Sequence, residues 1–143
     1  MNRSTVWGTA IVVAHLLLNI MHGRAHRELR IGLTPIGAMF VIVVVLILPL
    51  VAAVLLWTAK KRLGLMLLSL AMLGAFLFGW YHHFLAMGSD HVHSQPPNSW
   101  GLAFVLTSWG LLLTEAMGTY AGAHFLWIAK TPLDKGDSPS SHA

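Results

Sequence analysis

Charged residues are distributed so unevenly along this chain that long stretches have none. Residues 4–23, 31–59 and 63–89 contain no Asp, Glu, Lys or Arg, and residues 91–129 contain Glu115 alone. A helix needs about 20 predominantly apolar residues to cross a bilayer, and each stretch is long enough. Only 10% of the 143 residues are charged, against about 25% in soluble domains. The pattern predicts an all-α polytopic membrane protein with four spans and excludes an ordinary water-soluble globule.

The residues that flank these stretches set the ends of four predicted helices. No small-x-small cleavage site follows the first stretch, so we expect a retained membrane helix there and not a signal peptide. Pro49 has no N–H to donate and is expected to kink the second helix. The predicted helices extend over residues 5–21 with a helical pattern to residue 29, and over residues 38–57, 63–87 and 100–128.

These four helices use nearly the whole chain, which leaves no room for a second domain. We expect one domain at residues 1–130, an up-down-up-down four-helix bundle, and a disordered polar cytoplasmic tail at residues 131–143. Two aromatic belts support the helix ends. They are Trp7, Trp57 and Trp127 at one interface, and Trp80, Tyr81 and Trp100 at the other.

Lysine and arginine predict the orientation of the bundle. Six lie on the side of both termini and three on the other side: Arg3, Lys60, Lys61, Arg62, Lys130 and Lys135 against Arg24, Arg27 and Arg30. The positive-inside rule puts both termini in the cytoplasm, and the small size fits a bacterial inner membrane. The net charge is +4, but the basic residues flank apolar stretches and form no patch with interleaved aromatics. We therefore expect the lipid bilayer as a partner and no nucleic acid.

Histidine is the residue type that most narrows the chemistry. The chain has nine histidines and no cysteine, which excludes disulfides, thiolate metal sites and thiol catalysis. On the first predicted helix, successive spacings of four, three and four residues put four polar side chains on one face: His15, Asn19, His22 and His26. Polar groups in hydrocarbon cost free energy unless they have partners, so this face should point into the bundle.

Six histidines lie at the outer ends of the first and third helices or in the loop that follows: His22, His26, His82, His83, His91 and His93. His22 and His26 are one turn apart, a spacing at which two imidazoles converge on one ion. His82 and His83 point about 100° apart on a helix, so we expect only one of them to share that site. Asp90 can add an oxygen ligand or orient an imidazole. Together these residues predict a site for a transition metal (Cu, Fe or Zn) or haem at the non-cytoplasmic face.

Two partial resemblances bear on that site. His22 and His26, followed by His82 and His83, resemble the histidine boxes of membrane di-iron desaturases, although no HxxHH motif occurs in the chain. Imidazoles on different helices, His15 or His22 with His82 or His83, resemble the haem ligands of bis-histidine cytochrome b bundles. For the same residues, pH sensing, headgroup contact and partner contact are the alternatives.

A second polar group lies deeper in the predicted bundle. Glu115 is the one acid inside a predicted span, and helical spacing puts Thr107, Ser108 and Thr119 near its face. At about 1.5 Å per residue, Glu115 lies about 20 Å from the inner end of its helix, and His15 and Asn19 lie about 15 and 21 Å from theirs. We expect these three residues to meet, either as an intramembrane polar path for protons or redox chemistry or as a structural hydrogen bond.

Three functions remain open at this point. The first is a small membrane protein that binds a metal or haem, with redox or proton-coupled activity. The second is an accessory subunit of a larger membrane complex. The GxxxG motif of Gly118 and Gly122 permits another helix to approach closely, and that helix can belong to the bundle, to a membrane-protein partner or to a second copy of the chain. The third is a proton-coupled transporter or channel. No motif decides whether the protein is an enzyme.

Overall fold

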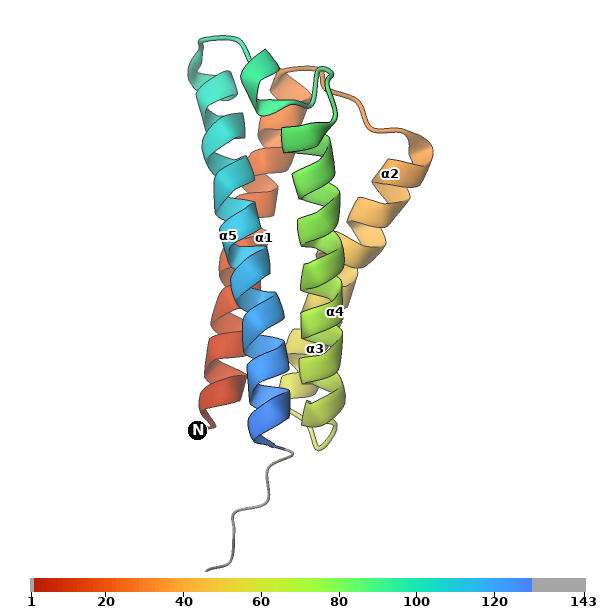
Figure 1. Cartoon of the computed structure of the whole chain (residues 1–143), viewed down its shortest axis with the longest axis vertical. Coiled ribbons are helices and arrows are strands. Elements are labelled where there is room, and N and C mark those ends of the chain that lie inside the picture. The colour runs from red at the N-terminus through yellow and green to blue at the C-terminus, as the bar shows by residue number, and fades with distance from the viewer. Residues whose placement is uncertain (1, 130–143) are drawn as a thin grey trace, which may run out of the picture.

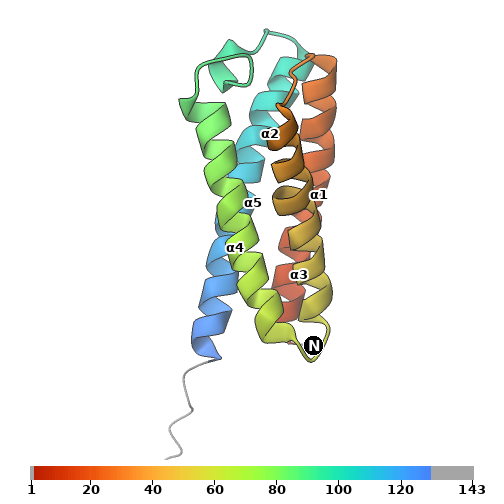
Figure 2. The ribbon, with the colours of Figure 1, turned by 90° about the vertical axis from the view of Figure 1, so that its right-hand side faces the viewer.

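The computed structural model describes residues 2–129, which form four long helical segments and, within that range, no strand (Figures 1 and 2). The all-α prediction is confirmed, and each segment lies close to its predicted range. The predicted tail at residues 131–143 lies outside the described residues. The segments are α1 (Arg3–Glu28); α2 (Pro35–Phe40), η1 (Val41–Ile47) and α3 (Leu48–Leu56); α4 (Lys61–Trp80) and η2 (Tyr81–Leu85); and α5 (Ser99–Ile128). A short 3-10 turn, η3 (Val92–Ser94), lies in the loop before α5.

Polar side chains at the helix ends explain where three of these segments begin. The side chain of Asn2 accepts a hydrogen bond from the Ser4 N–H, and that of Asn98 accepts from Trp100 and Gly101. Thr34 caps the second segment in the same way, with Pro35 at the first helical position. These side chains satisfy N–H groups that have no partner within the helix.

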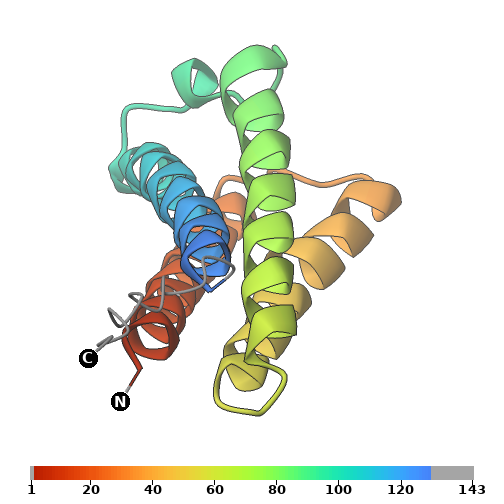
Figure 3. The same cartoon turned by 60° about the horizontal axis from the view of Figure 1, so that its bottom comes forward.

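The second segment diverges from the rest of the bundle along α2, while α3 packs against α1 and α4 (Figures 1 and 3). The distortion predicted at Pro49 takes the form of a π-helix, η1, on its N-terminal side. The Leu48 N–H bonds to the carbonyl of Val43, five residues back. The wider turn is the response to a proline that has no N–H for the carbonyl four residues earlier and whose ring crowds that carbonyl.

α5 packs along both α1 and α4, and its GxxxG lies on the α4 side. A Cβ at Gly122 would lie 2.7 Å from the carbonyl oxygen of Leu65, and one at Gly118 would lie 2.6 Å from Cγ of Met72. The two glycines therefore permit the close α4–α5 approach within this chain.

The two ends of the bundle differ in chemistry. The half that contains the N-terminus of α1 has an apolar core: Ile11, Val12, Ala52, Leu56, Leu65, Leu68 and Met72. At the other end, where α1 and η2 finish and α5 begins, the buried side chains include histidines. We call this the histidine end.

Candidate metal centre

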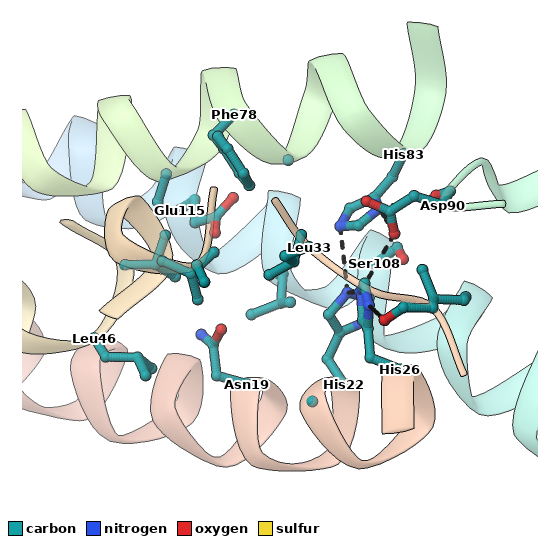
Figure 4. A pocket seen from close by; sticks show the side chains of 18 of the residues that line it. Asn19, His22, His26, Leu33, Leu46, Phe78, His83, Asp90, Ser108 and Glu115 are labelled. Atoms are coloured by element: carbon teal, nitrogen blue, oxygen red, sulfur yellow. Dashed lines mark hydrogen bonds and ion pairs between the residues drawn. The ribbon is translucent and has the colours of Figure 1, made fainter. Parts of the chain in front are cut away.

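Three imidazoles from two helical segments converge at the histidine end (Figure 4). His22 and His26 lie one turn apart on α1, and His83 lies on η2. Nε2 of His22 is 3.1 Å from Nε2 of His26 and 3.2 Å from Nε2 of His83. All three rings pack against Phe104 of α5. We call these residues the histidine triad.

The ends of the two segments shape the surroundings of the triad. Arg30 adopts a left-handed conformation with φ of 55°, and the Ile31 N–H bonds to the carbonyl of His26, as in a Schellman helix end. At the end of η2, the Ala86 N–H bonds to the carbonyl of Tyr81, five residues back. α1 thus ends in a left-handed turn and η2 ends in a π turn. After each turn the chain returns toward the imidazoles.

Backbone carbonyls fix the protonation of two of the imidazoles. Nδ1 of His83 lies 3.1 Å from the carbonyl oxygen of Asp90, and Nδ1 of His26 lies 3.4 Å from that of Ile31. A carbonyl oxygen only accepts hydrogen bonds, so the proton of each neutral ring is on Nδ1. Nε2 of both residues therefore presents a lone pair.

The hydroxyl of Thr107 likewise places the proton of the His22 imidazole on Nδ1. Nδ1 of His22 lies 2.9 Å from Oγ1 of Thr107. The Thr107 hydroxyl donates its own hydrogen to the carbonyl of Ala103 at 2.7 Å, so Oγ1 accepts from the imidazole. Nε2 of His22 presents a lone pair toward the other two Nε2 atoms.

Three lone pairs at this separation repel one another unless a cation lies between them. A tetrahedral ion with metal–nitrogen bonds of about 2.0–2.1 Å holds its ligand atoms about 3.3–3.4 Å apart, close to the 3.1 and 3.2 Å seen here. Metal-bound histidines also donate their other N–H to an oxygen acceptor, which fixes the tautomer and the ring orientation. The triad therefore has the donor atoms, spacing and outer hydrogen bonds of a metal-binding site.

Asp90 supplies a negative charge beside the triad. Its buried Oδ1 lies 3.3 Å from Nε2 of His26 and 3.2 Å from Nδ1 of His83. Burial raises the pKa of the Asp90 carboxyl, but the hydrogen bond and charge of the His83 imidazole, with the charges of His26 and His82, more than offset this, so the pKa lies below its usual range. An ionised carboxylate therefore lies beside the triad.

The other predicted ligands are not part of this cluster. His82 is not within ligand distance of the triad and packs against the rings of Phe78 and Tyr81. Nε2 of His91 lies 3.3 Å from the carbonyl oxygen of Phe84, and its Nδ1 accepts a hydrogen bond from the N–H of the exposed His93. The structure gives His91 the role of a loop contact.

A cavity of about 450 Å³ extends from the triad into the bundle (Figure 4). All four helical segments contribute to its lining, which includes the triad, Asp90 and Asn19, and Glu115 at greater depth. Its exposed lining residues are Gly23 and Arg27 on α1 and Leu33 in the connection to α2. The cavity therefore reaches the surface between α1 and α2, where the second segment diverges.

His15, Asn19 and Glu115 lie near one another in the bundle. Nδ1 of His15 lies 3.9 Å from Oε1 of Glu115, and both side chains are buried. The amide nitrogen of Asn19 donates to the backbone carbonyl of His15 at 3.0 Å. Thr107, which helical spacing associated with Glu115, instead contacts His22, 85 positions away in the sequence. No local pattern signals that contact.

Comparisons with protein-family models, with characterised proteins and with solved structures find no match for this chain. The function therefore has to be inferred from the site.

Proposed function

We propose that this chain is an integral membrane protein that binds one transition-metal ion through Nε2 of His22, His26 and His83, with Asp90 as the fourth ligand. The observation that carries the proposal is the convergence of three Nε2 lone pairs, each enforced by an oxygen acceptor at Nδ1. An aspartate ligand would balance part of the ion's charge inside the protein.

The outer surface of the bundle supports a membrane location. Four helices are long and apolar enough to cross a bilayer. Large apolar side chains face outward on every one of them, with Leu17 60%, Val54 65%, Leu70 65% and Leu113 63% exposed. An apolar surface of this extent is stable against lipid and not against water. In an up-down bundle with cytoplasmic termini, the histidine end lies at the non-cytoplasmic face.

The geometry favours a bare ion over haem. Axial haem ligands lie on opposite sides of the porphyrin, so no other residue can occupy the plane between them. In the triad, His26 and His83 both lie next to His22. If two of these imidazoles were axial ligands, the remaining one would occupy the space that the porphyrin needs. Imidazole nitrogens with one carboxylate oxygen suit Zn, and also Cu, Fe and Ni.

The other functions have less support. An open channel needs a continuous polar path, but beyond Glu115 the bundle is filled by the apolar core around Leu56, Leu68 and Met72. An accessory subunit that docks through Gly118 and Gly122 would compete with α4, which already contacts that face.

The test is the metal content of the full chain, purified in detergent, incubated with Zn²⁺ and desalted. We expect about one retained ion per chain, and none in the His22→Ala/His26→Ala variant. His82→Ala is the matched control, because this histidine is next to His83 in sequence and is not one of the three within ligand distance of one another. No retained ion in the wild type, or equal retention by the double variant, would refute the proposal.

A further inference from the structure

Two buried polar atoms in the middle of the bundle have no partner in the described part of the chain and no role in the triad. They are Nδ1 of His15 and Oε2 of Glu115. His15 is 1% exposed and Glu115 is 3% exposed, and the other carboxyl oxygen of Glu115, Oε1, lies 3.9 Å from Nδ1 of His15. A buried polar group that makes no hydrogen bond destabilises the folded protein, so such atoms call for an explanation such as a bound ion.

The distortion at Pro49 gives the His15 imidazole a backbone acceptor. Nε2 of His15 lies 3.1 Å from the carbonyl oxygen of Val45, the carbonyl that would accept from residue 49 in a regular helix. In the tautomer in which Nε2 donates to this carbonyl, Nδ1 presents its lone pair to Glu115. The amide nitrogen of Asn19 lies 3.0 Å from both Nε2 and the backbone carbonyl oxygen of His15, and an ion bound at Nδ1 selects the tautomer with the proton on Nε2.

The distance between His15 and Glu115 distinguishes a direct hydrogen bond from an ion bound between the two side chains. At 3.9 Å it is too long for a hydrogen bond; the longest one in the triad is 3.4 Å, between Nδ1 of His26 and the carbonyl oxygen of Ile31. It is slightly shorter than a metal–nitrogen and a metal–oxygen bond placed end to end, about 4.2 Å. One ion can therefore contact both atoms in a bent arrangement. The Asn19 side chain, whose oxygen makes no bond to His15, lines the same cavity and adds a neutral oxygen donor (Figure 4).

The same cavity extends from the triad to Asn19 and Glu115. Glu115 and the triad residues both line it, and Gly79 lies between them. A Cβ at Gly79 would lie 3.8 Å from Oε2 of Glu115 and 3.9 Å from Cδ2 of His83. The missing side chain leaves open the space through which an ion would pass from one group to the other.

We propose that His15 and Glu115, with the side-chain oxygen of Asn19, form a second and weaker site for a divalent transition-metal ion, about 10 Å deeper along α1 than His22. The inference rests on the proposed triad site, because the ion reaches the deeper site through the cavity that the triad lines. One imidazole in place of three makes the deeper site the weaker one. An ion there lies near the middle of the bilayer, with the cavity on one side and the apolar core on the other, as in carriers that hold their ion at mid-membrane.

The experiment is a Zn²⁺ titration of the full chain in detergent, with bound ions counted by equilibrium dialysis. We expect two ions per chain, the second bound at least about tenfold more weakly, since only one imidazole holds it. Glu115→Gln should remove the second ion and keep the first, while His22→Ala/His26→Ala should remove the first. Glu28→Gln, at the exposed end of α1, is the matched control for loss of a carboxylate and should bind two.

A single bound ion in the wild type, with the triad still required for it, would overturn the deeper site and leave the proposed function intact. Retention of the second ion by Glu115→Gln would also overturn it. If Glu115→Gln does not fold, as judged by its circular dichroism, His15→Phe keeps a ring of similar shape without Nδ1 and should show the same loss. Absence of both ions would refute the proposed function itself.

Discussion

Replacement of Thr107 by valine tests whether hydrogen bonds behind the imidazoles set the metal affinity. Valine has nearly the same shape, but it removes the oxygen that lies 2.9 Å from Nδ1 of His22. Thr107 is 8% exposed, so water cannot readily replace that oxygen. A buried donor that loses its acceptor costs about 1–3 kcal/mol, and loss of such outer partners weakens metal sites by about 10–100-fold. Since tenfold is about 1.4 kcal/mol, the two ranges agree.

The assay is competition for Zn²⁺ between the detergent-purified protein and a chromophoric chelator. We expect Thr107→Val to bind about 10–100-fold more weakly than the wild type, with unchanged helical content by circular dichroism. Thr114→Val is the matched control, because Thr114 on the same helix also donates its hydroxyl to carbonyls three and four residues back but is absent from the triad. If Thr107→Val binds Zn²⁺ within twofold of that control, the hydrogen bond from His22 to Thr107 does not set the metal affinity.

Three further predictions concern the ligand charge, the protons that compete with the ion, and the helix packing. Asp90→Asn keeps the shape of the side chain and loses its charge, so Zn²⁺ affinity should fall at least about tenfold, the scale of a lost charged partner; an unchanged dissociation constant would remove Asp90 from the ligand set. Zn²⁺ affinity should also be lower at pH 5.5 than at pH 7.5, because protons compete with the ion for the Nε2 lone pairs, and a flat titration series would contradict histidine ligation. Gly122→Leu should lower the unfolding temperature in detergent, because its Cβ would lie 2.7 Å from the Leu65 carbonyl and overpacking costs about 1–3 kcal/mol or more. Gly88→Ala, which meets nothing within 4 Å, should unfold like the wild type.

Local periodicity explains what could be predicted for the candidate site. The spacing of His15, Asn19, His22 and His26 determines that they share one face of α1, whatever the other helices do. His82 and His83 point about 100° apart on their helix, so only one of them can contribute to the site that His22 and His26 form. Which of the two joins is decided by the rotation of the third segment about its axis, set by its packing and by the π turn of η2.

The sequence by itself determined the four helices and their approximate ends, because long charge-free stretches and helical spacing act within one segment. Only the tertiary structure decided that His83 and not His82 completes the triad, that Thr107 and two carbonyls orient the imidazoles, and that His15 lies 3.9 Å from Glu115. The contacts of His22 with His83 and Thr107, and of His15 with Glu115, join residues far apart in the chain. They depend on how each helix is rotated and shifted along its neighbours, and the periodicity of a single helix contains no information about either.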